Sequence, residues 1–326
     1  MRMKQDVFVH VGYPKSASTT LQKHLFSKHE EIINLGVYPT KNIGIDSNSS
    51  PKNIPYLDEP ILRILHNDLV QMDSIEFHCS GFYENLSRFM DGVDLSKKVV
   101  FSNEKLTSVF FSYRDNGVKA RRLAKAFPDA KIIFIIRNQH DWLCSQYRDH
   151  PFDPRELTIG RPVSFDQWFN IICWNEQIKL KQMLNYYVVI GFYEKLFGES
   201  NIGVFLFEDL VNDEEAFSNK LSDFMGIDRS VTHELIAGQH ENRGVSGNYN
   251  RARCLLRGKL KNLIPDRVVS KILSMDKDGE KKEHALSLEN INRLNSLYSA
   301  GNEKLMHKYD LDLKSYGYPQ GGGLND

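Results

Sequence analysis

Residues 7–26 read VFVHVGYPKSASTTLQKHLF, and this segment contains the strongest structural signal in the chain. Its first five residues form a run rich in β-branched and aromatic side chains, which is typical of a buried strand that meets a turn at Gly12 and Pro14. After the turn, Ser18 and Thr19 are residue types that cap helices, and apolar residues then recur at helical spacing. The segment therefore predicts a strand, a loop and a helix in succession.

Three later segments predict further strands: KVVFS at 98–102, KIIFII at 131–136 and IGVFLF at 202–207. The second of these is apolar after its lysine, which is typical of a strand buried on both faces. Stretches with helical periodicity separate the strands, so we predict an α/β fold, a P-loop-like three-layer sandwich with a central, mostly parallel sheet flanked by helices. Ligands bind at the carboxyl ends of such strands, so we expect the loops after the first three predicted strands to share one cleft.

The composition is that of an ordinary globular protein, with 41% hydrophobic and 26% charged residues, which excludes wholesale disorder. The 42 basic side chains balance the 42 acidic ones, so no net charge attracts nucleic acid, and any anion site must be local. The four cysteines include no CxxC pair, which fits a reducing compartment and argues against a zinc module. No segment has the length of a membrane span or a signal-peptide core, and we expect a cytoplasmic protein without a transmembrane helix.

The domain organisation is expected to be simple. We predict one domain over residues 1–326, with a basic helical segment at about 251–285 and a loose C-terminal tail at 319–326. Within the basic segment, RARCLLRGKLK at 251–261 contains five basic and no acidic residues. It can bind an anionic glycan, make peripheral contact with an anionic membrane, act as a lid, or simply be a solvated face. The sequence leaves the oligomeric state open.

The loop GYPKSASTT at 12–20 has the features of a phosphate-binding cradle. Backbone N–H groups at a helix start, several hydroxyls and the Lys15 ammonium all favour an anion. The loop is not a Walker A motif, because Lys15 follows Gly12 by only three residues and the loop has no second glycine. The alternative reading is a capped helix with an exposed lysine.

Two motifs together resemble the sulfotransferases that use 3′-phosphoadenosine 5′-phosphosulfate (PAPS), in particular bacterial members related to glycan sulfotransferases. The 5′-phosphosulfate loop of that family is similar to YPKSGTTxL, and YPKSASTTL at 13–21 departs from it at Ala17 and Ser18. The family's 3′-phosphate segment places a serine eight residues after an arginine, as Arg137 and Ser145 are spaced here. The resemblance implies that these two residues hold the 3′-phosphate. It also implies that the 5′-phosphosulfate is held by Lys15, Ser16, Ala17, Ser18, Thr19 and Thr20.

Other segments extend the resemblance. FEDL at 207–210 resembles a structural motif of the family. Tyr187 lies near the position where cytosolic relatives place an aromatic ring against the adenine, although a core aromatic is an equally good interpretation. The loop HENRGVS at 240–246 resembles the loop that closes over PAPS, which makes Asn242 and Arg243 candidates for cofactor binding, with an exposed basic loop as the alternative.

The resemblance also implies a mechanism. Lys15 would neutralise the charge that develops on the leaving phosphate, and no metal is expected because the sulfuryl group carries less charge than a phosphoryl group. Relatives use a histidine or a glutamate as the general base, and Glu104 in FSNEKL at 101–106 stands at the corresponding place. The alternative for Glu104 is a first-turn acid in a capped helix. His10, inside the first strand, is expected to be a packed core residue rather than a base.

These observations predict an enzyme that transfers a sulfuryl group from PAPS to a hydroxyl, with a carbohydrate (polysaccharide, oligosaccharide or glycolipid) as the expected acceptor. The nearest enzymatic alternative is a P-loop kinase that uses ATP and Mg²⁺, because a strand, a loop with a lysine and a helix serve both chemistries. A different alternative is a non-catalytic module of this fold that binds a glycan or a protein partner.

Overall fold

The computed structural model describes residues 6–36, 64–77, 79–91, 94, 96–108, 115–149, 163–174, 179–239 and 285–321. Two compact units divide the chain: Met1–Arg137 with Tyr186–Glu241, and Asn138–Asn185 with Asn242–Asp326. The expected single domain over 1–326 therefore stays a prediction. The loop at 240–246 and the basic segment 251–261 lie outside the described residues, and the tail is described only as far as residue 321.

The first unit contains a five-stranded sheet with the strand order β2-β3-β1-β4-β5, in which every pair is parallel. Its strands are β1 (Val7–His10), β2 (Ile32–Asn34), β3 (Lys98–Ser102), β4 (Lys131–Ile136) and β5 (Ile202–Leu206). The sequence predicts four of these strands and misses β2, because three residues at a sheet edge carry too little pattern. The last predicted strand ends one residue early, since Phe207 begins a helix.

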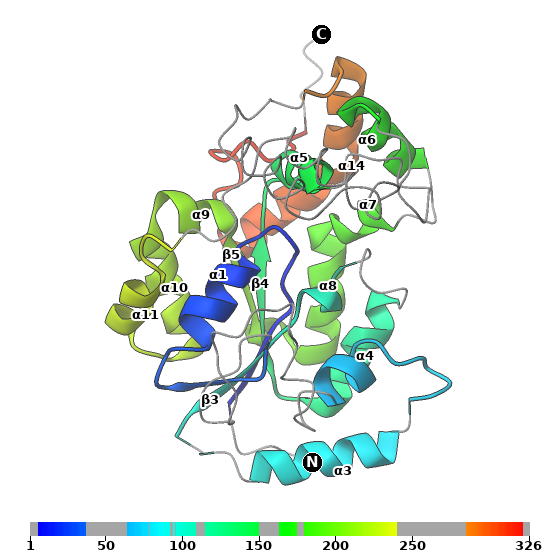
Figure 1. Cartoon of the computed structure of the whole chain (residues 1–326). Coiled ribbons are helices and arrows are strands. Elements are labelled where there is room, and N and C mark those ends of the chain that lie inside the picture. Colours follow the sequence, from blue (N-terminus) through cyan, green and yellow to red (C-terminus); the bar gives the residue numbers. More distant parts are fainter. Residues whose placement is uncertain are drawn as a thin grey trace, which may run out of the picture. The chain divides into compact units, whose positions relative to one another are not determined.

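Helices cover both faces of this sheet, as the fold class predicts (Figure 1). One face is covered by α1 (Ser18–Thr20), η1 (Leu21–Phe26), α9 (Phe207–Asn212), α10 (Glu214–Met225) and α11 (Arg229–Ile236). On the other face lie α4 (Asn116–Ala126) and α8 (Tyr186–Phe197). The remaining helical elements of the unit are η4 (Ile64–Leu69), α3 (Cys79–Asp91), η5 (Glu104–Leu106) and η6 (Glu199–Asn201).

The core of the first unit lies between the sheet and the helices that follow β1 and β5. Phe8 of β1 and Ile133 of β4 are buried in one cluster with Leu21 and Leu25 of η1 and with Phe217 of α10. Burial of each such side chain contributes about 1.5–3 kcal/mol relative to exposure. This packing holds the helix that follows the candidate phosphate-binding loop at 12–20. The loop therefore joins a strand and a helix that are both held in the core.

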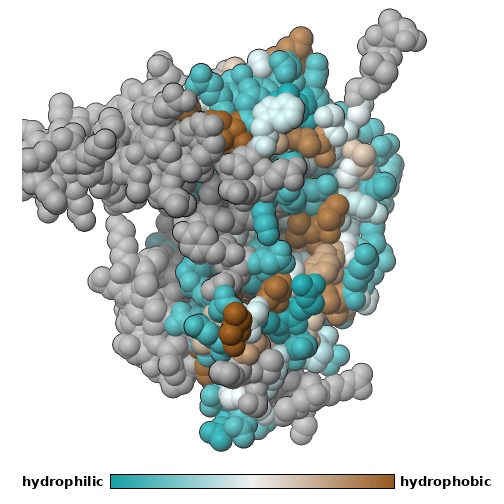
Figure 2. All heavy atoms as spheres, turned by 90° about the vertical axis from the view of Figure 1, so that its right-hand side faces the viewer, coloured by the Kyte–Doolittle hydropathy of each residue, from teal (hydrophilic) through white to brown (hydrophobic). Residues whose placement is uncertain are grey.

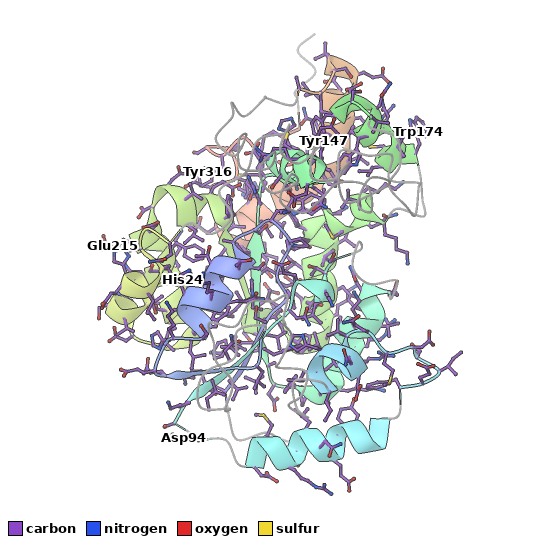
Figure 3. All side chains as sticks on the ribbon, in the orientation of Figure 1. His24, Asp94, Tyr147, Trp174, Glu215 and Tyr316 are labelled. Carbon is purple, nitrogen blue, oxygen red and sulfur yellow. The ribbon has the colours of Figure 1, made fainter. Side chains whose placement is uncertain are left out.

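The second unit contains α5 (Gln139–Asp149), α6 (Phe165–Trp174), α7 (Leu180–Met183) and α14 (Leu288–Tyr309). The carboxylate of Asp166 accepts hydrogen bonds from the backbone N–H of Ser287 and from Asn290 Nδ2, both at 2.8 Å, and these tie α6 to the start of α14. Trp174, at the end of α6, projects from the helix with 74% of its surface exposed, and the guanidinium of Arg293 lies 4.9 Å from its ring centroid (Figure 3).

The surface of the described residues mixes hydrophilic and hydrophobic side chains. On the face that carries α4 and α8, hydrophobic atoms lie in small patches among hydrophilic ones (Figure 2). Single exposed apolar residues of this kind are normal for a globular protein. Within the described ranges, every helix is too short or too polar to cross a lipid bilayer.

Candidate active site

The loop after β1 is built on two residues in left-handed backbone conformation, Lys15 (φ 67°) and Ala17 (φ 59°). A left-handed conformation costs a residue with a Cβ about 1–2 kcal/mol, and glycine avoids that cost. The hydroxyl of Ser18 donates to the carbonyl of Tyr13 at 3.2 Å, and no side chain caps the helix that starts at Ser18. The expected capping by Ser18 or Thr19 is therefore wrong, because the Ser18 hydroxyl closes the loop instead.

Ser16 lies at the centre of this loop. Its side chain has no exposed surface, and among the described residues none forms a hydrogen bond with Ser16 Oγ. A buried hydroxyl without a partner is costly, by about 1–3 kcal/mol. An anion oxygen in the loop would satisfy it, so the loop fits a bound phosphate or sulfate group.

Glu104 follows the end of β3, the strand beside β1. His10 and Ser102 are paired in the parallel register, and the N–H of Asn103 donates to the His10 carbonyl at 3.2 Å. Asn103 is the N-cap of η5, and its Oδ1 accepts from the N–H of Lys105 at 3.0 Å. Glu104 is thus a first-turn acid, as one interpretation of the sequence expects. That position leaves its role as a base open.

The electrostatics of Glu104 join it to the loop. Burial raises the pKa of the Glu104 carboxyl, while a side-chain interaction with Ser18 and the charge of Lys15 lower it. The net shift is upward, which makes the carboxyl a stronger proton acceptor than an exposed glutamate. Lys15, Ser18 and Glu104, which the sequence predicts at one cleft, therefore lie close together.

A second contact fixes the loop to the residues that follow β3. The hydroxyl of Thr107 lies 2.7 Å from the carbonyl oxygen of Gly12 and 3.1 Å from that of Val11. Thr107 is buried, so this bond is shielded from water. The chain on both sides of Glu104 is therefore hydrogen bonded to the β1 end of the sheet.

Arg137, the residue after β4, reaches the same loop. Its Nη1 donates to the carbonyl oxygen of Lys15 at 2.8 Å, and its guanidinium carbon lies 4.4 Å from the ring centroid of Phe207. The carbonyl of Arg137 accepts from the hydroxyl of Tyr186 at 2.7 Å, and the Tyr186 ring packs edge-on against Tyr13 at 4.9 Å. Sequence reasoning treats FEDL as purely structural and misses Tyr186. The hydrogen bonds of Arg137 to the Lys15 carbonyl and of Tyr186 to the Arg137 carbonyl cannot be predicted from the sequence, because every residue has a main-chain carbonyl that could accept them.

The remaining predicted cofactor residues are placed separately. Ser145 is half-buried on α5, in the second unit. Tyr187 lies on α8 with 36% of its surface exposed, so its interpretation as a core aromatic is wrong, while contact with adenine stays a prediction. Thr19 is half-buried and Thr20 buried behind the loop. Asn242 and Arg243 lie outside the described residues.

His10 is a core residue, as predicted. It has no exposed surface, and its Nδ1 lies 2.7 Å from the hydroxyl of Ser102, which also accepts from Gln22 Nε2 at 2.9 Å. Burial lowers the pKa of His10 to about 3, so its imidazole is neutral at physiological pH. Across the ranges that the structure describes, no three His, Cys, Asp or Glu side chains are grouped as metal ligands, and the expected independence from metal stays a prediction.

Comparison with known proteins decides the family. The sequence profile described as "Sulfotransferase family" matches residues 7–231, a range that contains the loop, Glu104 and Arg137. The chain belongs to the sulfotransferase family. The sulfotransferase is an enzyme of the EC 2.8.2 class, which transfers a sulfuryl group from PAPS to an acceptor.

One solved structure agrees with this assignment at the level of the fold. A sulfotransferase from Alicyclobacillus acidocaldarius is 17% identical with a TM-score of 0.50, and the match covers 96% of this chain and 98% of that one. The mouse sulfotransferase SULT7A1 complexed with PAP is 13% identical with a TM-score of 0.46, over 96% and 88% of the two chains. No curated protein sequence matches the sulfotransferase at a significant level. The α/β fold of the sulfotransferase is thus the one predicted.

Proposed function

We propose that this sulfotransferase transfers the sulfuryl group of PAPS to a hydroxyl of a carbohydrate, with Lys15 stabilising the leaving phosphate and Glu104 acting as the general base. The observation that carries the proposal is the proximity of these two side chains, which come from the ends of adjacent strands and interact electrostatically. A base and a leaving-group cation must lie on opposite sides of one reacting group, and their positions after two adjacent parallel strands permit that.

The donor site is proposed to be the loop and its surroundings. The unsatisfied hydroxyl of Ser16 and the left-handed backbone at Lys15 and Ala17 suit the 5′-phosphosulfate. The planar guanidinium of Arg137 lies beside the loop, hydrogen bonded to the Lys15 carbonyl, and guanidinium groups suit bidentate contacts with a phosphate such as the 3′-phosphate. The other proposed contacts to PAPS are those of Ser18, Thr19, Thr20, Ser145, Tyr187, Asn242 and Arg243.

The proposed chemistry is an in-line displacement at sulfur. The acceptor oxygen forms a bond to sulfur while the bond between sulfur and the bridging oxygen of the donor breaks, and Glu104 takes the hydroxyl proton. Charge builds on the bridging oxygen, where the ammonium of Lys15 meets it. The residues named here require no metal for these steps, and we propose that the reaction proceeds without one.

A carbohydrate acceptor is the finer part of the proposal. It is supported by the resemblance to glycan sulfotransferases and by a carboxylate at the position where cytosolic relatives use a histidine. The basic segment 251–261 is a candidate to contact an anionic acceptor or the surface of a membrane that carries a glycolipid. We propose a cytoplasmic location, since PAPS and reduced cysteines both suit that compartment.

Transfer of radiolabelled sulfate from PAPS tests the proposal. Purified protein is incubated with labelled PAPS and a panel of polysaccharides, oligosaccharides, glycolipids and phenols, and labelled products are separated by charge. We expect label on a carbohydrate. Label on phenols alone would contradict the acceptor class, and thermal stabilisation by ATP with Mg²⁺ but not by PAP (3′-phosphoadenosine 5′-phosphate) would favour a kinase instead.

A further inference from the structure

The turn that carries Glu104 is short. The element η5 spans only Glu104–Leu106, and it follows directly from the end of β3. A single 3₁₀ turn of this length has little stability of its own, because one or two hydrogen bonds do not compensate for the conformational entropy lost when its dihedral angles are fixed. The direction in which the Glu104 carboxyl points therefore depends on what holds the two ends of the turn.

The first end is held by a buried histidine. Asn103, the N-cap of the turn, lies with its Nδ2 2.8 Å from Nδ1 of His66, and Nε2 of His66 lies 3.3 Å from the carbonyl oxygen of Leu35. The amide nitrogen of Asn103 is a donor, so Nδ1 of His66 accepts and Nε2–H donates to Leu35. The Asn103 oxygen then remains available to cap the N–H of Lys105.

The burial and the neutral charge of His66 allow its ring to accept the hydrogen bond from Asn103. The ring is buried in η4 and packs edge-on against Phe101 of β3 at 5.6 Å, so its orientation is fixed. Burial lowers the pKa of His66 to about 4, and the imidazole is therefore neutral over the usual pH range. A charged imidazole would carry a proton on both nitrogens and could not accept from Asn103.

The second end is held by a buried lysine. Lys119, in the middle of α4, has no exposed surface, and its Nζ donates to the carbonyl oxygen of Lys105 at 2.5 Å. Among the described residues, no carboxylate lies within ion-pair distance of Lys119; burial lowers the pKa of its ammonium to about 8, and the charge of Asp115 opposes only part of that shift. An unpaired buried charge is expensive, and an apolar residue of the same volume is often as stable or more stable. The structural benefit of a lysine here is therefore small.

We propose that His66 and Lys119 are positioning residues for the general base: they hold Asn103 and Lys105, and thereby direct the carboxylate of Glu104 toward the loop of Lys15. The inference rests on the proposed role of Glu104. Neither residue touches substrate in this proposal. Each acts through the backbone or the cap of the turn, from a separate element, so the two restraints are independent.

The test compares turnover with stability in variants that keep volume. Lys119→Met keeps the chain length and removes the charge, and His66→Phe keeps the ring and removes both hydrogen bonds. We expect each to lower kcat roughly tenfold, because a small displacement of a reacting group is costly. The dissociation constant for PAP should stay within about twofold, since the donor loop is intact. Lys119→Met is expected to melt no lower than the wild type.

Two further variants make the test specific to the hydrogen bonds. His66→Gln can still accept from Asn103 and donate to Leu35, and we expect it to keep most of the turnover that His66→Phe loses. Asn103→Asp keeps the oxygen that caps Lys105 but loses the donor to His66, so it should lower kcat as His66→Phe does. The double variant His66→Phe with Asn103→Asp should lose no more than either single one, because both break the same link. This series also serves if Lys119→Met fails to fold.

The outcomes separate the inference from the function on which it rests. Glu104→Gln is measured in parallel, and its normal turnover would overturn both the base and its positioning. A slow Glu104→Gln together with normal kcat in Lys119→Met and His66→Phe would overturn the positioning alone. A fall in melting temperature without a fall in kcat would assign both residues a purely structural role, and that also overturns it.

Discussion

Arg137 Nη1 donates a hydrogen bond of 2.8 Å to the main-chain carbonyl of Lys15, and this bond links the residue after β4 to the loop after β1. The carbonyl belongs to Lys15, whose backbone is in the left-handed conformation that residues other than glycine rarely adopt. The hydrogen bond therefore restrains the backbone at this unusual position. The guanidinium plane is held over Phe207 at the same time. One side chain thus links the loop after β1 to the residue after β4 and to Phe207.

The first prediction concerns this link. Arg137→Ala removes a charge-assisted hydrogen bond and a proposed phosphate contact, so we expect the affinity for PAP to fall at least tenfold, the equivalent of about 1.5–3 kcal/mol. Arg137→Lys keeps the positive charge but loses the planar guanidinium that can bind a phosphate through two hydrogen bonds, so it should recover only part of that affinity. Isothermal titration calorimetry with PAP measures both. Unchanged affinity in Arg137→Ala would exclude the arginine from the nucleotide site.

Lys15→Ala should nearly abolish turnover. Removal of one group that stabilises transition-state charge lowers kcat by about 10²–10³, and PAP binding should weaken less than kcat. Lys28→Ala is the matched control, because Lys28 is exposed just beyond the helix that follows the loop. Single-turnover measurements with labelled PAPS distinguish loss of chemistry from loss of binding. If the Lys15 variant keeps most of its rate, another group must neutralise the leaving phosphate.

The pH dependence of turnover reports on Glu104. Its pKa lies above the ordinary 4.5, so a base must lose activity as the pH falls through that raised value and must be fully active well above it. We expect kcat to show this acid limb, and Glu104→Gln to lower kcat by about 10²–10⁴ and to abolish the limb. Glu30→Gln, at an exposed position, is the control. An acid limb that persists in Glu104→Gln would belong to a different group.

Ala17→Gly tests the strain in the loop. Alanine at φ 59° costs about 1–2 kcal/mol, while glycine loses about 0.4–1 kcal/mol through the entropy of the unfolded chain. The substitution should therefore leave the free energy of unfolding unchanged or raise it by up to about 1.6 kcal/mol. Urea unfolding measures this change. Ala120→Gly in α4 is the contrast and should be destabilising, because Ala120 is buried in a regular helix.

Acid stability should reflect two of the buried histidines, His10 and His66. Burial lowers the pKa of His10 to about 3 and that of His66 to about 4, below the value of about 6.5 in the unfolded chain. Between pH 6.5 and these values the unfolded state binds protons that the folded state does not, so stability falls as the pH falls. Each histidine should cost about 2 kcal/mol at pH 5 relative to pH 7. His66→Gln should reduce the loss measured by urea unfolding between the two pH values by about 2 kcal/mol, and an unchanged loss would contradict this account.

The sheet could be predicted because central parallel strands are continuous apolar runs that stand out in a chain of average composition. The meeting of Lys15 and Glu104 was also predictable, since the carboxyl ends of adjacent parallel strands share an edge. Ser18 illustrates the limit of such reasoning. Its type suits a helix cap, but its hydroxyl donates to the Tyr13 carbonyl instead, because the left-handed turn at Ala17 brings it back over the loop.

Local pattern in the chain is enough to predict four of the five strands and the residue types that can bind an anion, because those properties depend on neighbours a few positions apart. The bond from Arg137 to the Lys15 carbonyl, the hold of His66 on Asn103 and the burial of Lys119 depend on the folded molecule. Each of these side chains forms a hydrogen bond with a group from a different strand, helix or loop. Packing of the sheet and its helices decides which of the many identical carbonyls and amides each side chain meets.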